Sequence, residues 1–255
     1  MEKNKEQWDK LYTFQEEVLE SFSQIKQSVS TIYFGGGTAL ARFYLNHRLS
    51  EDLDFFADNI FQFYQESLLI SRQIQAKYKT SENLPKEESE DYSFFYIEKD
   101  DIALKIEIQN YFENRVGKIH TLRNGLKIDN LENILSNKLT TFCNRNEPKD
   151  LFDIICIANN FCFDWSCILQ ASSKKQLETD EYAGKKENVV KSIYNFNYDR
   201  LEKFLNSYYC LDKKNNFNEL KKKAFTLRDD LNKEQWNSLS QSSILIEDAK
   251  PHLLH

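Results

Sequence analysis

The sequence predicts an α/β (α+β) protein, with a small mixed sheet and its helices in the first half and a helical region in the second. Two features of the apolar pattern carry this prediction. Before residue 130, short apolar runs are interrupted by turn residues and helical segments. From Asn130 onward, apolar residues recur mainly at spacings of three and four, as in amphipathic helices. We therefore expect a first domain over residues 1–129 and a second over residues 130–255.

The bulk composition excludes several classes of protein. A chain of 255 residues with 40% apolar content can bury a sizeable core. The formal net charge of −6 argues against a uniformly basic nucleic-acid-binding protein, although it allows a local basic groove. Five cysteines without a C-x-x-C pair favour buried, reduced thiols over disulfides or a zinc site. The charged N-terminus and the lack of a long apolar run argue against a signal peptide and a membrane span, so we expect a cytoplasmic protein.

The first expected elements are two helices and two strands. In chain order they are an amphipathic helix over residues 5–29, a strand over Thr31–Phe34, a helix over Ala39–Asn46 and an apolar strand that contains Asp52-Leu53-Asp54. A run of three glycines, closed by Thr38, separates the first strand from the second helix. We expect the first helix to pack across the sheet that these strands begin.

The glycine run and the two aspartates predict a phosphate site and a metal site. Residues without a Cβ let the backbone approach a ligand closely, and N–H groups at the start of a helix suit phosphate oxygens. In a strand, residues two apart point to the same face, so Asp52 and Asp54 are expected to project together. Two adjacent carboxylates repel each other. Mg²⁺ or Mn²⁺ would relieve this repulsion, because both prefer oxygen ligands and bind nucleotide phosphates.

The middle of the chain predicts a helix followed by two strands. In chain order we expect a helix over Ile60–Lys79, an exposed polar loop over Thr80–Glu90, and strands over Tyr92–Glu98 and Ile102–Gln109. Asp100 and Asp101 form the turn between the strands. In the second strand, alternation places Leu104, Ile106 and Ile108 on one face and Lys105, Glu107 and Gln109 on the other.

The rest of the chain predicts a hairpin and then helices. Gly117 and Asn124-Gly125 are turn signals for a small hairpin within residues 115–129. Helices are expected over Asn130–Asn144, from Pro148 onward, and over Asp164–Lys174, Tyr198–Tyr208, Asn218–Phe225 and Leu231–Leu239. The last four segments give no chemical signal.

Several polar residues have two interpretations from the residues alone. Arg48 could contact a triphosphate, which its planar fork suits, or cap the end of the preceding helix. Ser50 could bind phosphate or start the turn into Asp52. Lys138 is by default a solvated helix lysine. Asp153 lies among apolar residues and needs a partner such as Arg145, Lys149 or a ligand, so a buried ion pair and a site residue are both open.

The stretch Ile32–Phe56 resembles the AbiEii/AbiGii-type nucleotidyltransferase toxins of the polymerase-beta-like nucleotidyltransferase superfamily. Their signature, Gly-Gly-Thr-Ala-Leu, a short helix and His-Arg-x-Ser-x-Asp-Leu-Asp-Phe-Phe, is matched by Gly36, Gly37, Thr38, Ala39, Leu40, His47, Arg48, Ser50, Asp52, Leu53, Asp54, Phe55 and Phe56. A second family motif, a helix lysine followed by basic-Asp-Leu-aromatic-Asp, is matched by Lys138, Lys149, Asp150, Leu151, Phe152 and Asp153. The two matches come in the expected order, and so many fixed positions make chance an unsatisfactory explanation.

The resemblance implies a nucleotidyltransferase core followed by a helical domain that closes the nucleotide cleft. It implies transfer of NMP from an NTP to an acceptor hydroxyl, with RNA or tRNA as the acceptor, by the toxin of a toxin–antitoxin or phage-defence system. Asp52, Asp54 and Glu107 would hold the catalytic Mg²⁺ or Mn²⁺. The nucleotide would contact Gly36, Gly37, Thr38, Arg48, Ser50, Lys138 and Asp153. Any antitoxin partner is expected to be a separate chain.

Two alternatives from other functional classes stay open. A small-molecule nucleotidyltransferase, such as an antibiotic-modifying enzyme, would have an acidic acceptor pocket. A non-catalytic nucleotide-binding or RNA-binding protein could share the fold, although such a protein has no need for a paired metal site. For Glu107, an ordinary outward-facing position next to Lys105 is the alternative to a third metal ligand. Nothing in the sequence identifies the NTP or the acceptor.

Overall fold

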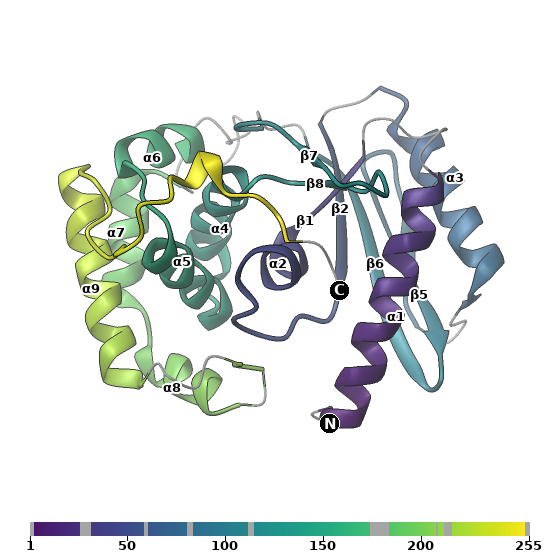
Figure 1. Ribbon diagram of the computed structural model, residues 1–255, viewed down its shortest axis with the longest axis horizontal. Coiled ribbons are helices and arrows are strands. Elements are labelled where there is room, and N and C mark those ends of the chain that lie inside the picture. Colours follow the sequence, from purple (N-terminus) through teal and green to yellow (C-terminus); the bar gives the residue numbers. More distant parts are fainter. Residues whose placement is uncertain are drawn as a thin grey trace.

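The protein combines one mixed sheet with helices, which confirms the predicted α/β class. The structure is a computed structural model, and it describes residues 3–25, 32–58, 61–80, 84–111, 115–173, 184–207, 209–211 and 216–252. Figure 1 shows the sheet with α1 and α3 in one half of the molecule and α4 to α9 in the other. In the described part of the chain, no helix has the length and apolar character needed to span a membrane.

The sheet has eight strands within the described residues. Their bounds are β1 Tyr33–Gly35, β2 Leu53–Asp58, β3 Lys79–Thr80, β4 Glu87–Glu88, β5 Tyr92–Lys99, β6 Ile102–Tyr111, β7 His120–Thr121 and β8 Lys127–Ile128. The strand order is β3-β5-β6-β2-β1-β8-β7, and β4 pairs with β5. The β2–β6 and β1–β8 pairs are parallel and the other pairs are antiparallel, so the sheet is mixed as predicted.

The register of the central strands aligns three functionally interesting positions. Asp54 of β2 is paired with Glu107 of β6, and Glu107 is paired with Phe94 of β5. Neighbouring strands lie about 4.8 Å apart, so these residues form one line across three strands. The line places the second aspartate of the Asp-x-Asp pair beside the predicted third carboxylate.

The two faces of this part of the sheet differ in burial. Leu53, Phe55 and Ala57 of β2 are buried, and the residues between them are only partly buried. The buried face packs against α1 (Lys5–Gln24) and α3 (Phe63–Lys77), which lie beside β5 and β6 in Figure 1. Phe22 of α1 stacks on Phe55 with ring centroids 4.0 Å apart. The predicted packing of the first helix across the sheet is therefore confirmed, although residues 26–31 lie outside the described part.

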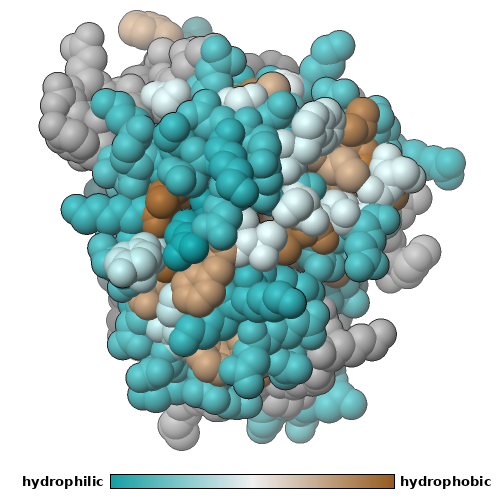
Figure 2. Space-filling view, turned by 90° about the vertical axis from the view of Figure 1, so that its left-hand side faces the viewer, coloured by the Kyte–Doolittle hydropathy of each residue, from teal (hydrophilic) through white to brown (hydrophobic). Residues whose placement is uncertain are grey.

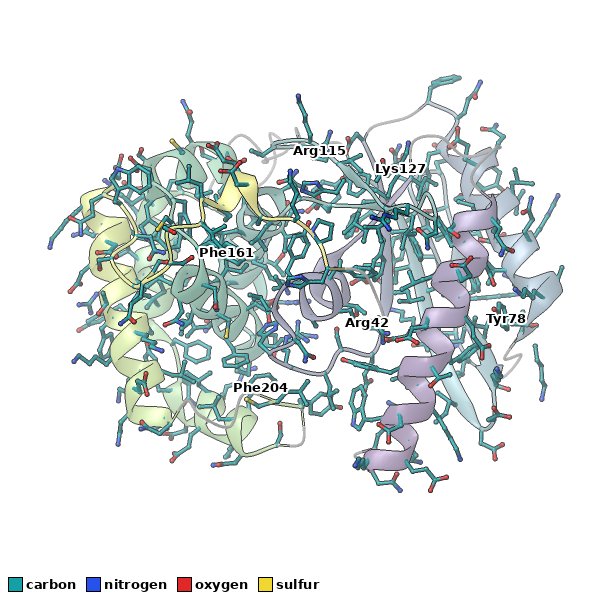
Figure 3. The ribbon with its side chains drawn as sticks, viewed as in Figure 1. Arg42, Tyr78, Arg115, Lys127, Phe161 and Phe204 are labelled. Carbon is teal, nitrogen blue, oxygen red and sulfur yellow. The ribbon has the colours of Figure 1, made fainter. Side chains whose placement is uncertain are left out.

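The glycine run forms the start of a helix rather than a loop before one. Helix α2 covers Gly36–Leu40 and continues directly into η2, a π-helical segment over Ala41–Leu45. Asn46 ends it in the left-handed region with φ 47°. Arg42 reaches from η2 to α1, where it forms an ion pair with Glu16 (Figure 3). The helix therefore starts three residues earlier than predicted.

The second half is helical, as predicted. Its helices are α4 Leu131–Arg145, α5 Pro148–Asn160, α6 Trp165–Ser173, α7 Lys186–Asn195, α8 Tyr198–Asn206 and α9 Phe217–Lys233, and η3 Ile246–Asp248 is a short 3₁₀ turn. Asn130 caps α4 by accepting a hydrogen bond from the backbone N–H of Asn133. Pro148 occupies the first turn of α5, where its missing N–H costs nothing.

The secondary structure differs from the predictions in three places. The helix expected over Asn218–Phe225 is confirmed as part of α9, but α9 continues to Lys233, and the separate helix expected over Leu231–Leu239 is wrong because Glu234 ends α9 in a left-handed conformation. Helix α7 was not predicted. The loop expected over Thr80–Glu90 contains β4, and Thr80 belongs to β3; both two-residue strands exist through pairing with β5.

The helical half is joined to the sheet half by backbone pairing. Leu49 N–H donates to the Tyr209 carbonyl at 2.7 Å, and Leu211 N–H donates to the His47 carbonyl at 3.0 Å. The C-terminal segment crosses to η2, where His252 N–H meets the Phe43 carbonyl at 2.6 Å (Figure 1). A division into domains at residue 129 stays a prediction.

The surface of the helical half is mostly hydrophilic, with scattered apolar side chains (Figure 2). Isolated exposed apolar residues are normal on a globular protein. All five cysteines are free thiols. Cys156 and Cys210 are buried as predicted, whereas the predicted burial is wrong for Cys167, which is exposed at the start of α6.

Candidate active site

The glycine run lies directly against two charged side chains. A Cβ added to Gly36 would overlap Oδ2 of Asp54, and the φ of +68° at Gly36 is itself unfavourable for other residues. A Cβ added to Gly37 would lie 2.5 Å from Nη2 of Arg48. The two glycines therefore make room for a carboxylate and a guanidinium group at the start of α2.

A cavity of about 230 Å³ lies between this point of the sheet and helix α4. It is on the side of β2 that carries Asp54, opposite to the face covered by α1. The lining residues are Gly36, Gly37, Asp54, Phe56, Gln109, Tyr111, Ile134, Asn137, Lys138, Thr141 and Arg145. Of the predicted site residues, the cavity thus brings together Gly36, Gly37, Asp54 and Lys138.

Asp54 and Asp52 carry unfavourable negative charge. Burial raises the pKa of Asp54 to about 7, with further contributions from Glu107 and Asp52, and Lys138 opposes this shift. Burial also raises the pKa of Asp52, which lies just before β2. Both side chains keep some exposure to solvent. Crowded carboxylates of this kind favour either a bound proton or a bound cation.

Glu107 is held by a neighbour on its own strand. Its carboxylate forms an ion pair with Lys105, and both side chains are partly exposed. The structure therefore shows the alternative interpretation, an outward-facing Glu107 next to Lys105. The charge of Glu107 also raises the pKa of Asp54. The role of Glu107 as a third metal ligand stays a prediction.

The donor set at this point fits a divalent metal. Within the described residues, no group of three or more His, Cys, Asp or Glu side chains is placed to enclose a metal ion. Mg²⁺, however, is commonly held by one or two carboxylates together with substrate phosphates and water. Asp52 and Asp54 supply such a pair: burial raises the pKa of both, and neighbouring carboxylates, Glu107 in each case, raise them further.

A buried ion network centred on Asp153 backs the cavity. Asp153 of α5 is fully buried and accepts hydrogen bonds from Arg48 Nε at 2.6 Å and Arg48 Nη2 at 2.8 Å. Lys138 Nζ lies 2.7 Å from Oδ2, and His47 Nε2 lies 2.7 Å from Oδ1. Burial would raise the pKa of Asp153, but Arg48 and Lys138 hold it well below its usual value. The expected partners Arg145 and Lys149 are not the ones observed.

Lys138 links Asp153 to a second buried aspartate. Its Nζ contacts Asp150 Oδ1 at 2.9 Å, and Asp150 also accepts hydrogen bonds from Arg145 Nε at 2.6 Å and Nη2 at 2.8 Å. Lys138 is 7% exposed, so the default interpretation as a solvated lysine is wrong. Arg145 is about half exposed and lines the cavity. Lys138 and Arg145, both on α4, therefore bring two positively charged groups to the cavity wall.

Arg48 and His47 are buried in this network. The guanidinium group of Arg48 is occupied by Asp153 and by the Leu49 carbonyl at 3.0 Å. Burial lowers the pKa of His47, so its neutral ring donates from Nε2 to Asp153. Neither residue lines the cavity. Contact between Arg48 and a phosphate stays a prediction, and the observed contacts indicate a supporting position.

Thr38 and Ser50 hold the turn that leads into Asp52. The Thr38 hydroxyl lies 2.8 Å from Ser50 Oγ and 2.5 Å from the Asp52 carbonyl oxygen. Thr38 is fully buried, and the Ser50 carbonyl accepts a hydrogen bond from Gln15 of α1 at 3.0 Å. For Ser50, these contacts match the turn interpretation. A direct nucleotide contact by either side chain stays a prediction.

The sequence analysis missed several residues that line the cavity. Asn137, Thr141 and Arg145 continue the stripe of Lys138 along α4 at spacings of three and four. That polar stripe is visible in the sequence next to the apolar one. Gln109 and Tyr111 lie on the same side of β6 as Glu107, as strand alternation requires.

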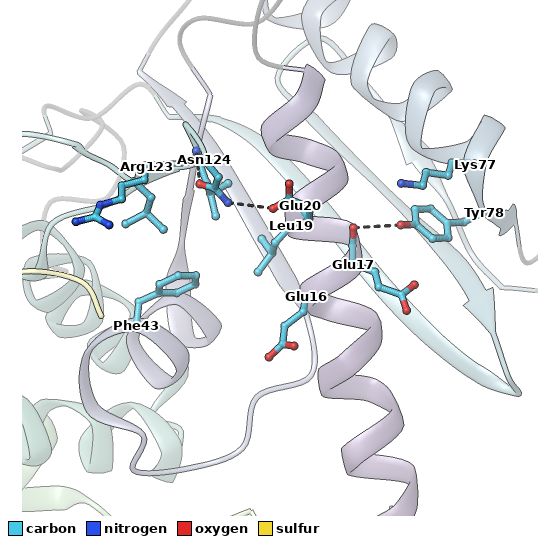
Figure 4. Close-up of a pocket in the computed structure, with 11 residues that line it drawn as sticks. Glu16, Glu17, Leu19, Glu20, Phe43, Lys77, Tyr78, Arg123 and Asn124 are labelled. Carbon is cyan, nitrogen blue, oxygen red and sulfur yellow. Dashed lines mark hydrogen bonds between the residues drawn. The ribbon is translucent and has the colours of Figure 1, made fainter. Parts of the chain in front are cut away.

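A larger cavity, about 770 Å³, lies elsewhere, between α1, the end of α3 and the β7–β8 turn (Figure 4). Its rim includes glutamates of α1, but Glu16 pairs with Arg42 and Glu17 pairs with Lys99. Glu20 accepts a hydrogen bond from Asn124 at 3.2 Å. This cavity contains none of the candidate site residues, and its carboxylates already have partners.

Comparisons with known proteins identify the family of the chain and proteins of similar fold. A family model described as nucleotidyl transferase AbiEii toxin, Type IV TA system, matches residues 18–243. No curated protein matches the chain. The fold is similar to that of JHP933 from Helicobacter pylori, with 18% identity, a TM-score of 0.56, and coverage of 91% of this chain and 96% of that one. MenT4, a nucleotidyltransferase toxin from Mycobacterium tuberculosis H37Rv, is 16% identical with a TM-score of 0.51, covering 65% of this chain and 63% of its own.

Proposed function

The chain belongs to the AbiEii family of nucleotidyltransferase toxins, and from this premise we propose that it transfers a nucleoside monophosphate from an NTP to a hydroxyl of an RNA such as tRNA. It would act in the cytoplasm, where both substrates occur, as the toxin of a toxin–antitoxin or phage-defence system. The antitoxin would be a separate chain. The observation that carries the proposal is the position of Asp54, which lies against Gly36 and faces a cavity with Lys138 on its other wall.

The phosphates of the NTP would lie between the glycine run and α4. The backbone at Gly36 and Gly37 forms one wall of the cavity, and Lys138 and Arg145 line the opposite side. Lys138 has three N–H donors, of which Asp150 and Asp153 account for two. The third donor can meet a phosphate oxygen. A cavity of about 230 Å³ accommodates the phosphate part of a nucleotide, and the nucleoside would extend toward its opening.

Asp52 and Asp54 would hold Mg²⁺ or Mn²⁺, and Glu107 would join them if Lys105 releases it. When bound, such an ion supplies Lewis-acid stabilisation of the negative charge that develops on the transferred phosphoryl group. The protein side chains would mainly position and neutralise the substrates. Ionised Asp54 would also accept a hydrogen bond from the attacking hydroxyl, because it faces the same cavity as the phosphates.

Asp153 and Arg48 would act by positioning. Asp153 fixes the Lys138 ammonium group at the cavity wall through the 2.7 Å contact. Arg48 donates a hydrogen bond to the same carboxylate oxygen of Asp153. Arg48 Nη2 also lies against Gly37, so the same ion pair supports the start of α2. The nucleotide-binding role of Asp153 would therefore be indirect.

The proposal is tested by incubating the purified protein with Mg²⁺, total tRNA and each α-labelled NTP in turn. The expected result is label in RNA with at least one nucleotide, which also identifies that nucleotide. Label in no RNA, although the protein is folded and binds an NTP, would contradict the RNA acceptor. Repeating the assay with aminoglycosides in place of tRNA then tests the small-molecule alternative.

A further inference from the structure

A row of aromatic side chains lies on the uncovered face of β5. Tyr92, Phe94 and Tyr96 are partly exposed, and they alternate with Ser93 and two apolar residues that are buried on the other face. The ring centroids of Tyr92 and Phe94 are 5.8 Å apart, and those of Phe94 and Tyr96 are 6.4 Å apart. Helices α1 and α3 pack on the opposite face, and all three aromatic side chains keep part of their surface exposed within the described part of the chain.

The aromatic row lies on the strand next to Glu107 and two strands away from Asp54. Phe94 is the cross-strand partner of Glu107, which is in turn the partner of Asp54. Two strand spacings amount to about 10 Å, and all three side chains are on the same face of the sheet. A molecule lying on the row would therefore have to cross only β6 to reach Asp54.

The charges around the row are arranged asymmetrically. On the β6 side, Lys105 Nζ lies 4.7 Å from the centroid of the Phe94 ring and forms the ion pair with Glu107. On the β4 side, Glu87 is the cross-strand partner of Phe94. Because Lys105 is paired with Glu107, the β6 side carries no net charge, whereas the β4 side carries the negative charge of Glu87. A polyanionic backbone would thus be repelled along β4 and not along β6, while flat groups could stack on the rings.

We propose that Tyr92, Phe94 and Tyr96 form the acceptor surface, on which unpaired bases at the 3′ end of an RNA stack while its terminal hydroxyl reaches Asp54. This inference rests on the proposed nucleotidyltransferase function. The row extends over four residue steps of β5, roughly 13 Å, which exceeds what one base or a small acceptor needs. Stacking on aromatic rings is tolerant of sequence, because every base has a π face.

The structural alternative is that the rings only stabilise the sheet. Aromatic cross-strand neighbours do contribute to sheet stability. In that case β-branched residues, which also favour strands, would preserve both folding and RNA binding. Replacement of rings by isoleucine therefore separates the two explanations.

The test uses Tyr96→Ile and the double variant Phe94→Ile/Tyr96→Ile, with steady-state transfer measured against RNA and against NTP. We expect the KM for RNA to rise about 5- to 100-fold per lost stacking ring while the KM for NTP stays within about twofold. Anisotropy of a labelled single-stranded RNA oligonucleotide should show the same loss in binding. Phe94→Trp, which keeps a π face, should retain affinity. Tyr194→Ile, which removes an exposed tyrosine of α7, is the matched control.

The outcomes separate this inference from the function on which it rests. If the unaltered protein transfers nucleotide to RNA and both isoleucine variants retain its KM for RNA, the aromatic row is not the acceptor surface. If only the KM for NTP rises, the base of the nucleotide stacks there instead, and the inference is also wrong. Absence of transfer by the unaltered protein would overturn the proposed function itself. If the double variant does not fold, the single variant Tyr96→Ile is used for the same test, because it removes one ring at the end of the row.

Discussion

Arg48 and Asp153 form a two-pronged, fully buried ion pair, with Nε–Oδ1 and Nη2–Oδ2 distances of 2.6 and 2.8 Å. The pair joins the loop before β2 to helix α5, and Lys138 shares the same carboxylate. The candidate site is therefore attached to the helical half through one aspartate.

Loss of this aspartate should destabilise the protein strongly. Asp153→Ala would leave the buried Arg48 without its anionic partner and Lys138 with Asp150 alone, and loss of one partner of a buried ion pair costs about 3–5 kcal/mol in comparable cases. Urea denaturation would measure the free energy of unfolding. Glu6→Gln, which breaks the exposed pair with Lys10, is the control and should have no measurable effect. A loss below about 1 kcal/mol for Asp153→Ala would show that the network contributes little.

Arg48→Lys should also be destabilising, although the charge is kept. Lysine cannot donate two parallel hydrogen bonds to one carboxylate, and its ammonium group is strongly hydrated. We expect a lower melting temperature together with lower transfer activity, because the start of α2 rests on the Arg48 guanidinium group. A variant with unchanged melting temperature but a raised KM for NTP would instead support direct phosphate contact by Arg48.

Asp54→Asn should stabilise the metal-free protein at high pH. The pKa of Asp54 is about 7 in the folded protein, whereas an unfolded aspartate titrates near 3.9. Between these values the folded state holds the extra proton, so stability falls as pH rises from about 4 to 7. Asparagine removes this loss. In EDTA, the melting temperature of Asp54→Asn should exceed that of the unaltered protein by a few degrees at pH 8 and equal it at pH 4. A lower melting temperature of the variant at pH 8 would show that the Asp54 charge does not destabilise the folded protein.

Mg²⁺ or Mn²⁺ should stabilise the protein through the same carboxylates. Ligands that bind only the folded state raise the melting temperature. We expect a rise with millimolar Mg²⁺ at pH 8 that shrinks as the pH falls through about 7, because protons then compete for Asp54. Asp52→Asn/Asp54→Asn should abolish the rise, and Asp199→Asn on the exposed side of α8 should preserve it. An equal rise in all three proteins would place the metal elsewhere.

Gly36→Ala should damage the site by steric conflict. Its Cβ would overlap the Asp54 carboxylate, and alanine is unfavourable at a φ of +68°. Gly125→Ala in the β7–β8 turn, where φ is 89°, is the control for backbone strain alone. We expect the Gly36 variant to lose more stability than the control. Adding Asp54→Gly should restore only the part of the stability that the overlap costs, because the backbone strain at position 36 remains, and it should not restore transfer. Failure to restore any stability would argue against this contact.

Much of the site was predictable because its signals are local. The Asp-x-Asp pair, the glycine run and the alternation that turns Glu107 away from the core all depend on neighbours in the sequence. The register that pairs Asp54 with Glu107 follows from burying Phe55 and Ile106 on one face. The start of the helix at Gly36 was missed because glycine is normally a poor helix former.

The rest depended on long-range contacts. Arg48 and Asp153 are more than 100 positions apart, and no local pattern reveals that a buried carboxylate takes the guanidinium group. Strands β3 and β4 have two residues each and exist only through pairing with β5. The aromatic residues of β5 were read as an ordinary strand, because only the sheet order shows that they lie beside Glu107.

The central claim is that Asp54 takes part in nucleotidyl transfer, and a paired transfer assay tests it most directly. Asp54→Asn and the control Asp199→Asn are compared with the unaltered protein, using the labelled NTP that supports transfer to tRNA and with folding checked by circular dichroism. We predict that Asp54→Asn loses transfer by at least about 100-fold, while Asp199→Asn keeps it. Full activity of a folded Asp54→Asn protein would contradict the account.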